Sequence, residues 1–239
     1  MLDNMRIVLV GTTHPGNIGA AARAMKNMML SDLRLVQPRL FPSAEATARA
    51  SGADDLLEAT QVYPDLDSAL ADCVQVMATS ARLRSLPWPV LEPRDAAVEA
   101  LKRAAEGPVA ILFGREHSGL TNQELERCSH LIHIPTSPEY SSLNLGAAVQ
   151  VVAYELLQAA RGTGREIVER ESPLASDAER QGFYAHLEEA LIDIGFLDPA
   201  TPKQLMRRLR RLFNRCDLEQ SEIHILRGIL KKAQRCAGK

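Results

Sequence analysis

Five short apolar runs, separated by stretches with helical periodicity, constrain this fold more than any other feature. The runs lie at residues 6–10, 33–37, 74–78, 109–113 and 131–135, and the helical patterns lie at 17–29, 43–50, 67–71, 92–105, 121–128 and 141–160. Short apolar strands that alternate with helices are typical of a mainly parallel sheet with helices on both faces. We therefore expect an α/β domain over residues 1–160.

The last of these helical patterns, at 141–160, is apolar on nearly every side. A surface helix normally keeps one polar face, so this helix needs a second apolar cover besides the sheet. A symmetric homodimer is the commonest way to provide that cover, although a central helix in a monomer is the alternative. At the helix starts, the expected caps are Asn17, the pair Thr121 and Glu124 as a capping box, and Ser141.

The C-terminal part has a different composition. Residues 161–176 are polar, with two glycines and a proline, and are predicted to be a linker. Helical patterns follow at 177–196, 202–216 and 218–235, so residues 177–239 are predicted to form a small all-α domain. Residues 1–171 carry 16 Lys and Arg against 21 Asp and Glu, a net charge of −5, whereas residues 172–239 carry 12 against 9, a net charge of +3. The basic excess favours a polyanionic partner for this domain.

Half of the lysines and arginines of residues 172–239 lie in the helix predicted at 202–216. Its apolar stripe is expected to comprise Leu205, Leu209, Leu212 and Cys216. The remaining positions carry six cations and no acid, namely Lys203, Arg207, Arg208, Arg210, Arg211 and Arg215. Because uncompensated cations repel one another, we expect this surface to bind a phosphate backbone, with a plain solvated face as the alternative.

Several classes of protein are not expected. Four scattered cysteines form no C-x-x-C pair, which favours reduced, mostly buried thiols over a disulfide framework. His130 and His133 lie three residues apart on a predicted strand and so point to opposite faces, which makes a metal site unlikely to form there. No segment approaches the ~20 apolar residues that span a membrane, and the first ten residues read as a strand rather than a leader. We expect a cytoplasmic protein.

Four junctions between strands and helices carry residues suited to a ligand. The first, HPGNIGAAARAM, combines Gly16, Asn17 and Gly19 with Arg23. Gly19 lies one turn before Arg23 on the same face, so the predicted gap would let the arginine lean toward the strand ends. The two glycines could equally serve only a tight turn.

The other three junctions are ATSARLRSLPW, FGREHSGL and IPTSPEYSSLNLG. Thr79, Ser80 and Ala81 are small enough for a ligand to approach the backbone, and Arg82 and Arg84 add two cations. The second of the three is a loop bounded by Gly114 and Gly119. Neither G-x-G-x-x-G nor a Walker-type phosphate loop is present, so a dinucleotide fingerprint is not expected.

Three of these segments, taken together and in order, resemble the motifs of one enzyme family. N-x-G-x-x-x-R (Asn17 to Arg23), F-G-x-E-x-x-G-L (Phe113 to Leu120) and I-P…S-L-N-L (Ile134 to Leu145) are similar to the three motifs of the SPOUT RNA 2′-O-ribose methyltransferases. The resemblance covers residues 1–160. It implies a trefoil knot at about residues 75–155, S-adenosylmethionine as methyl donor, and a homodimer formed through the first and last helices.

The resemblance also implies roles for individual residues. Arg23 and Ser142 match the catalytic positions, with Arg23 either accepting the O2′ proton or gripping the target phosphate. The donor-binding residues would be Thr79, Ser80, Ala81, Gly114, Glu116, Ile134, Leu143 and Asn144. Independently of the resemblance, we expect RNA contacts from Asn17, from the loop cations Arg82 and Arg84, and from Lys203, Arg207, Arg208 and Arg211 of the basic helix.

The substrate is expected from two finer segments. TSARLRSLPWP and PEYSSLNL are similar to the branch of the family that methylates nucleotide 32 in the tRNA anticodon loop. The expected partner is therefore tRNA. Two alternatives stay open: the same chemistry at the wobble nucleotide or in ribosomal RNA, and a module that binds RNA without catalysis.

Overall fold

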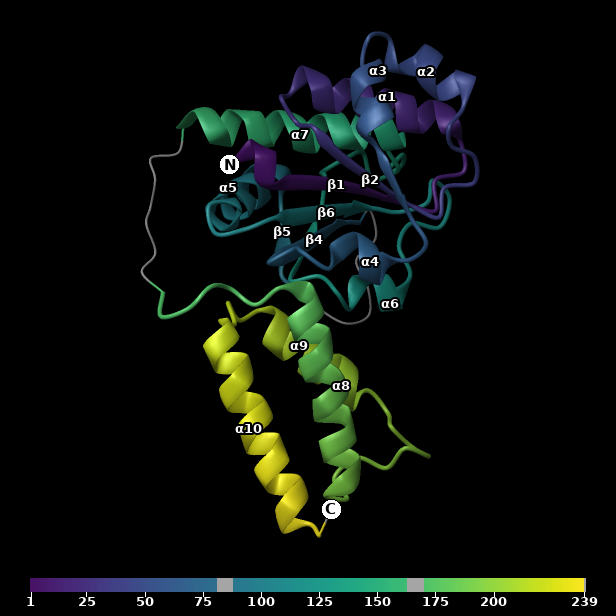
Figure 1. The fold of residues 1–239 in the computed structure, drawn as a ribbon. Coiled ribbons are helices and arrows are strands. Elements are labelled where there is room, and N and C mark those ends of the chain that lie inside the picture. The colour runs from purple at the N-terminus through teal and green to yellow at the C-terminus, as the bar shows by residue number, and fades with distance from the viewer. Residues whose placement is uncertain (81–87, 163–169, 239) are drawn as a thin grey trace.

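A seven-stranded parallel sheet forms the centre of the molecule (Figure 1). The computed structural model describes residues 1–80, 88–162 and 170–238. The sheet has the order β3-β2-β1-β6-β4-β7-β5, and each neighbouring pair of strands in it is parallel. Its strands are β1 (Met5–Val10), β2 (Asp32–Val36), β3 (Gln61–Tyr63), β4 (Gln75–Thr79), β5 (Val90–Leu91), β6 (Val109–Phe113) and β7 (His130–Ile132). The predicted parallel α/β sheet is confirmed.

Helices cover both faces of this sheet, as predicted. One face carries α1 (Pro15–Asn27), α2 (Ala44–Ala50), α3 (Asp54–Ala59), α5 (Pro93–Ala104) and α7 (Leu145–Gly162). The other face carries α4 (Leu66–Leu70) and α6 (Asn122–Leu125). Alternate residues of β1 enter the two cores: Ile7 and Leu9 face the first set of helices, and Val8 and Val10 face the second. This alternation follows from the period of two along a strand. A short 3₁₀ helix (Leu2–Asn4) precedes β1.

Two predicted helix caps differ from the structure. The capping box of Thr121 and Glu124 is present. Asn17, however, lies inside α1, which begins at Pro15 and has His14 as its N-cap residue. Ser141 does not cap α7 either, because that helix begins at Leu145, and the Oδ1 atom of Asn144 accepts hydrogen bonds from the backbone N–H groups of Gly146 and Ala147. Asn144 is therefore the cap of α7.

Close helix contacts explain two glycines. A Cβ atom on Gly19 would lie 2.0 Å from the carbonyl oxygen of Ala46 in α2, and one on Gly146 would lie 2.7 Å from the Cβ atom of Ala20 in α1. The helix α1 is thus held between α2 and α7 by backbone contact. The outer face of α7 stays uncovered in the single chain, where Tyr154 is 47% exposed.

The C-terminal residues form a separate three-helix bundle, drawn below the sheet in Figure 1. Its helices are α8 (Asp177–Asp193), α9 (Leu205–Asn214) and α10 (Gln220–Cys236). The core comprises Ala175, Phe183, Tyr184, Leu187 and Ile223. The predicted stripe of α9 is partly wrong, because Leu212 and Cys216 are exposed. The residues of α9 that face the bundle core are Met206, the predicted Leu209 and Phe213, spaced by three and four residues.

The segment that leads into α8 is docked on the sheet domain. Arg161 and Gly162 belong to α7, and residues 163–169 lie outside the described part. Leu174 and Ala175 are buried, although they fall within the predicted linker. The backbone N–H of Asp177 donates to the carbonyl of Cys73, just before β4. No helix in the described ranges is long and apolar enough to cross a membrane.

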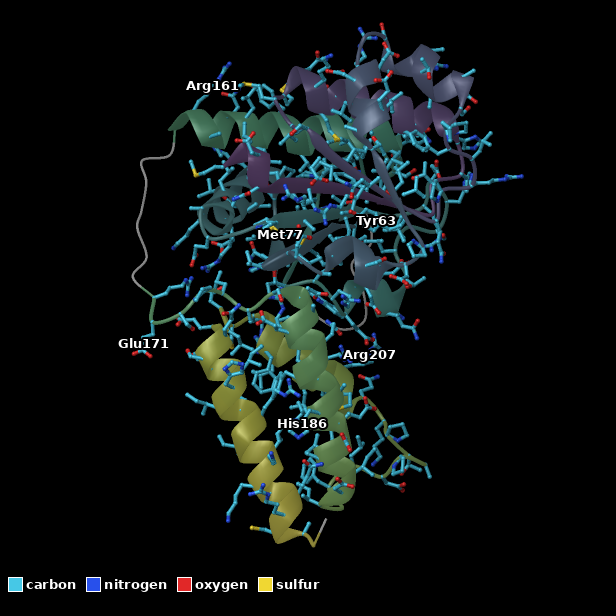
Figure 2. All side chains as sticks on the ribbon, viewed as in Figure 1. Tyr63, Met77, Arg161, Glu171, His186 and Arg207 are labelled. Carbon is cyan, nitrogen blue, oxygen red and sulfur yellow. The ribbon has the colours of Figure 1, made fainter. Side chains whose placement is uncertain are left out.

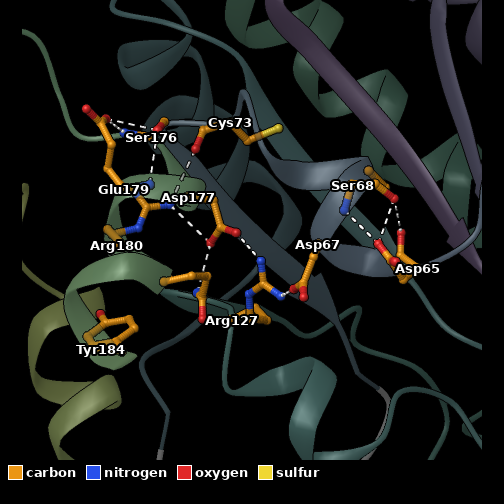
Figure 3. Close-up of polar contacts among 12 residues, drawn as sticks. Asp65, Asp67, Ser68, Cys73, Arg127, Ser176, Asp177, Glu179, Arg180 and Tyr184 are labelled. Carbon is orange, nitrogen blue, oxygen red and sulfur yellow. Dashed lines mark hydrogen bonds and ion pairs between the residues drawn. The ribbon is translucent and has the colours of Figure 1, made fainter. Parts of the chain in front are cut away.

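Ion pairs fix this docking (Figure 3). Asp177 is 1% exposed and lies between the guanidinium groups of Arg127 and Arg180, and Arg127 also pairs with Asp67 of α4. Arg180 donates hydrogen bonds to the carbonyls of Val74 and Ala175. The bundle is therefore attached to the loops that precede strands β4 and β7, at the amino edge of the sheet.

Candidate functional site

A cavity of about 160 Å³ opens at the opposite, carboxyl edge of the sheet. Three neighbouring strands, β6, β4 and β7, end there, because the parallel order places their loops side by side. Six of the predicted donor-binding residues line this cavity, namely Thr79, Ser80, Gly114, Glu116, Ile134 and Leu143, and so does Ser142. Ala81, Arg82 and Arg84 lie outside the described residues. This edge is where ligands bind in open parallel sheets.

The loop after β6 is a tight, glycine-dependent structure. A Cβ atom on Gly114 would lie 2.3 Å from the carbonyl carbon of Gly119, and Gly119 itself has φ of +67°. Reciprocal backbone hydrogen bonds join Arg115 and Gly119. The Arg115 guanidinium pairs with Glu124 of α6 at 3.1 Å, so this cation is already neutralised. The loop presents backbone groups to the cavity at close range.

Glu116, in the same loop, reaches the start of α1. Its carboxylate accepts hydrogen bonds from the backbone N–H groups of Thr13 and His14, from the Thr13 hydroxyl at 2.8 Å and from the Asn17 side-chain amide at 2.9 Å. Burial raises the pKa of the Glu116 carboxyl, but the hydrogen bonds from Asn17 and Thr13 outweigh burial and lower the pKa to about 2. Glu116 therefore holds the segment that enters α1 and the Asn17 side chain in its first turn, from 99 to 103 residues away in the sequence.

Asn17 joins this network to the third predicted motif. Its Oδ1 atom accepts a hydrogen bond of 2.9 Å from the side-chain amide of Asn144, the residue that caps α7. Asn144 does not line the cavity, although its neighbours Leu143 and Leu145 do. The segments quoted from the sequence therefore meet through three side chains, Glu116, Asn17 and Asn144. Thr13 and His14 were not singled out in the sequence, although they belong to the loop that follows β1, where site residues are expected.

Arg23 lies in a neighbouring groove. This groove is bordered by residues of α1, α2 and α7, including Ala20, Arg49, Asn144 and Gln150. Arg23 is exposed, and its guanidinium makes no hydrogen bond or ion pair with any described residue. The predicted reason for its orientation was wrong: the Gly19 position is filled by the backbone of α2 rather than left open. The groove and the donor cavity adjoin at residues 142–146.

The predicted basic surface of α9 is only partly free. Arg207 lies at the junction with the sheet domain, where its Nε atom is 2.5 Å from a carboxylate oxygen of Glu126 (Figure 2). Arg210 donates to Gln181 and lies 4.7 Å from the ring centre of Tyr184. Arg211 is half-buried, whereas Lys203, Arg208 and Arg215 are exposed. The exposed cations therefore belong to a bundle attached at the end of the sheet away from the cavity.

The four cysteines differ in their burial, and two histidine rings lie near polar partners. Cys73 and Cys128 are buried, but Cys216 and Cys236 are exposed, so only half of the thiols match the expected burial. His130 Nδ1 lies 3.0 Å from the Ser129 hydroxyl, and His133 Nδ1 lies 3.3 Å from the carbonyl of Ser80. Within the described part of the chain, no three His, Cys, Asp or Glu side chains gather as a metal site.

Comparison with known proteins identifies the family. The family model described as the SpoU rRNA methylase family matches residues 4–154. The chain belongs to the SpoU methylase family. A second model, the C-terminal domain of the tRNA methyltransferase TrmJ, matches residues 178–239, which is the helical bundle. The family resemblance inferred from the three motifs is confirmed.

Individual relatives agree with this assignment to the SpoU methylases. The chain is 53% identical to the tRNA (cytidine/uridine/adenosine-2′-O-)-methyltransferase TrmJ of Pseudomonas aeruginosa, over 99% of this chain and 96% of the relative. It is 50% identical to the tRNA (cytidine/uridine-2′-O-)-methyltransferase TrmJ of Pectobacterium atrosepticum, over 98% of each. The crystal structure of TrmJ from Z. mobilis matches with a TM-score of 0.82 and 38% identity, covering 95% of this chain and 97% of that one.

Proposed function

We propose that this SpoU-family protein transfers a methyl group from S-adenosylmethionine to the ribose 2′-oxygen of nucleotide 32 in the tRNA anticodon loop. The observation that carries the proposal is that two of the motif segments line one cavity and that hydrogen bonds among Glu116, Asn17 and Asn144 join them to the first motif, in α1. Relatives about 50% identical are named as tRNA 2′-O-methyltransferases acting on cytidine and uridine. A tRNA substrate also supports a cytoplasmic location.

The lining of the cavity fits this donor. Ile132, Ile134, Leu143 and Leu145 supply apolar surface for an adenine ring, and Gly114 and Gly119 bring backbone groups close enough to bond its edge. Arg115 and Glu116 are engaged with Glu124 and with the start of α1, so neither presents a free charge to the ligand. We assign donor binding to the six described lining residues named above and to Ala81.

The donor supplies a methyl group on a positively charged sulfur, ready for displacement. The protein must then hold the ribose O2′ in line with the bond between that sulfur and the methyl group. Such alignment can lower the free-energy barrier by about 7–11 kcal/mol. We assign Ser142, which lines the cavity, to contact with O2′. Arg23 suits gripping a phosphate of the target nucleotide rather than accepting a proton, because a guanidinium group stays protonated in proteins.

Two further properties are part of the proposal. A homodimer formed through α1 and α7 would cover the exposed face around Tyr154 and border the groove of Arg23. A trefoil knot is supported by the strand order, since β7 lies between β4 and β5 although β4 and β5 are consecutive in the chain.

The exposed cations Lys203 and Arg208, with Arg207 and Arg211 beside them, would extend the contact along the tRNA.

A methylation assay tests the proposal. Unmodified tRNA transcripts are incubated with S-adenosylmethionine, and the product is mapped by nuclease digestion and mass spectrometry. We expect one 2′-O-methyl group at nucleotide 32 and a loss of at least about 100-fold in rate for Arg23→Ala, since removing one transition-state contact costs about this much. Donor binding should survive in this variant. Methylation at another nucleotide would keep the chemistry and refute the target, and an active Arg23→Ala would refute the role of the arginine.

A further inference from the structure

Tyr140 is the most exposed large apolar side chain reported for the described residues, at 80%. It belongs to the loop between β7 and α7 and stands two residues before Ser142. An aromatic ring left in water forgoes the free energy that its burial would contribute. The Tyr140 hydroxyl makes no hydrogen bond with a described residue. Among the described residues, neither packing nor hydrogen bonding explains this side chain.

The loop that carries Tyr140 borders the cavity, although Tyr140 itself is not among the lining residues. The backbone N–H of Tyr140 donates to the carbonyl of Ser137 at 3.1 Å, closing a turn. The Thr136 hydroxyl donates to the carbonyl of Ser141 at 3.0 Å, which closes the base of the loop. Thr136, Ser141 and Ser142 all line the cavity. The ring is therefore carried on a braced turn whose base forms part of the cavity wall.

We propose that Tyr140 is the platform on which the base of the target nucleotide stacks during methyl transfer. This inference rests on the proposed function and adds a substrate contact to it. The ribose must enter the cavity to reach the donor, so the attached base is left at the rim, which the loop of Tyr140 borders. Unpaired bases of RNA loops are commonly bound by stacking on exposed aromatic rings. A ring that the described residues leave 80% exposed would gain a stacking partner when the loop nucleotide binds.

Steady-state kinetics with Tyr140→Ala and Tyr140→Phe test the inference. Loss of one stacking contact should raise the KM for tRNA about tenfold in Tyr140→Ala, whereas Tyr140→Phe keeps the ring and should stay within about twofold of the parent. Binding of S-adenosylhomocysteine, measured by calorimetry, should be unchanged in both variants. Phe196→Ala is the matched control, because Phe196 is also highly exposed, at 68%, but lies at the end of the bundle between Asp193 and Asp198.

A modified substrate separates stacking on the target base from other roles of Tyr140. This substrate is a tRNA assembled by ligation that carries a ribose without a base at nucleotide 32. The difference in KM between the parent and Tyr140→Ala should vanish with this substrate. A difference that persists on this substrate would overturn the inference, as would unchanged kinetics on normal tRNA. Loss of donor binding or of the parent's sedimentation behaviour in Tyr140→Ala would assign the ring a structural role instead. Failure of the parent enzyme to methylate any tRNA would overturn the proposed function itself.

Discussion

The two edges of the parallel sheet are built in contrasting ways. At the carboxyl edge, Glu116, Asn17 and Asn144 join the loops through hydrogen bonds, and Gly114 brings backbone within contact distance. At the amino edge, charged pairs centred on Asp177 attach a bundle of helices. The length of β4, about 17 Å at ~3.3 Å per residue, separates the two. One edge thus forms the proposed site while the other carries a second domain, and substitutions should separate their effects.

Removing Asp177 is expected to produce the largest effect on stability. Asp177→Ala leaves Arg127 and Arg180 without their buried carboxylate, and breaking a buried pair in this way typically costs about 3–5 kcal/mol. Donor binding at the far edge should be unchanged. Circular dichroism follows all helices during urea unfolding, while the single tryptophan, Trp88, reports only on the sheet domain.

Asp67→Ala is the matched control for this experiment. Asp67 pairs with the same arginine, Arg127, but its side chain is 79% exposed. Exposed pairs contribute little, so this variant should lose less than about 1 kcal/mol. Equal losses in the two variants, or a loss of donor affinity in Asp177→Ala, would contradict the division between the two edges.

The sequence was informative about the sheet but not about contacts between distant segments. Apolar runs located five of the seven strands, because buried parallel strands are continuous apolar segments. The two missed strands, β3 and β5, have three and two residues and carry no such run. The order β4-β7-β5 depends on pairing across the chain, which no local pattern encodes.

The site was predicted by motif but not by geometry. The motifs singled out Glu116, Asn17 and Asn144, and the structure joins the three, but their hydrogen bonds span 99 to 127 residues and cannot be read from spacing. Gly19 was explained by an open space that α2 in fact fills. Arg207 was counted with the free cations, and its partner, Glu126, belongs to the other domain.

The bundle can be tested for a part in binding tRNA without disturbing the carboxyl edge. Lys203 and Arg208 are exposed and make no ion pair with described residues, so Lys203→Ala with Arg208→Ala should fold normally. Loss of two phosphate contacts should lower the slope of log affinity against log salt by up to about 2, and should weaken tRNA binding at low salt about tenfold. Filter binding over a salt series measures this slope. An unchanged slope would show that these cations do not touch the RNA backbone.

Acid titration gives the smallest expected effect and tests the carboxyl edge alone. The folded protein holds the pKa of Glu116 at about 2, below its ordinary value of 4.5, so between these values the unfolded chain binds the extra proton. Stability from this group is present above about pH 4.5 and is lost as the pH falls toward 2. Glu116→Gln cannot titrate, so its melting temperature should fall less steeply than that of the parent over this range. Glu58→Gln removes an exposed carboxylate of α3 that makes no hydrogen bond with described residues, and should keep the parent slope. If Glu116→Gln also kept the parent slope, the ionised Glu116 carboxylate would not stabilise the contact between the loop after β6 and the segment that enters α1.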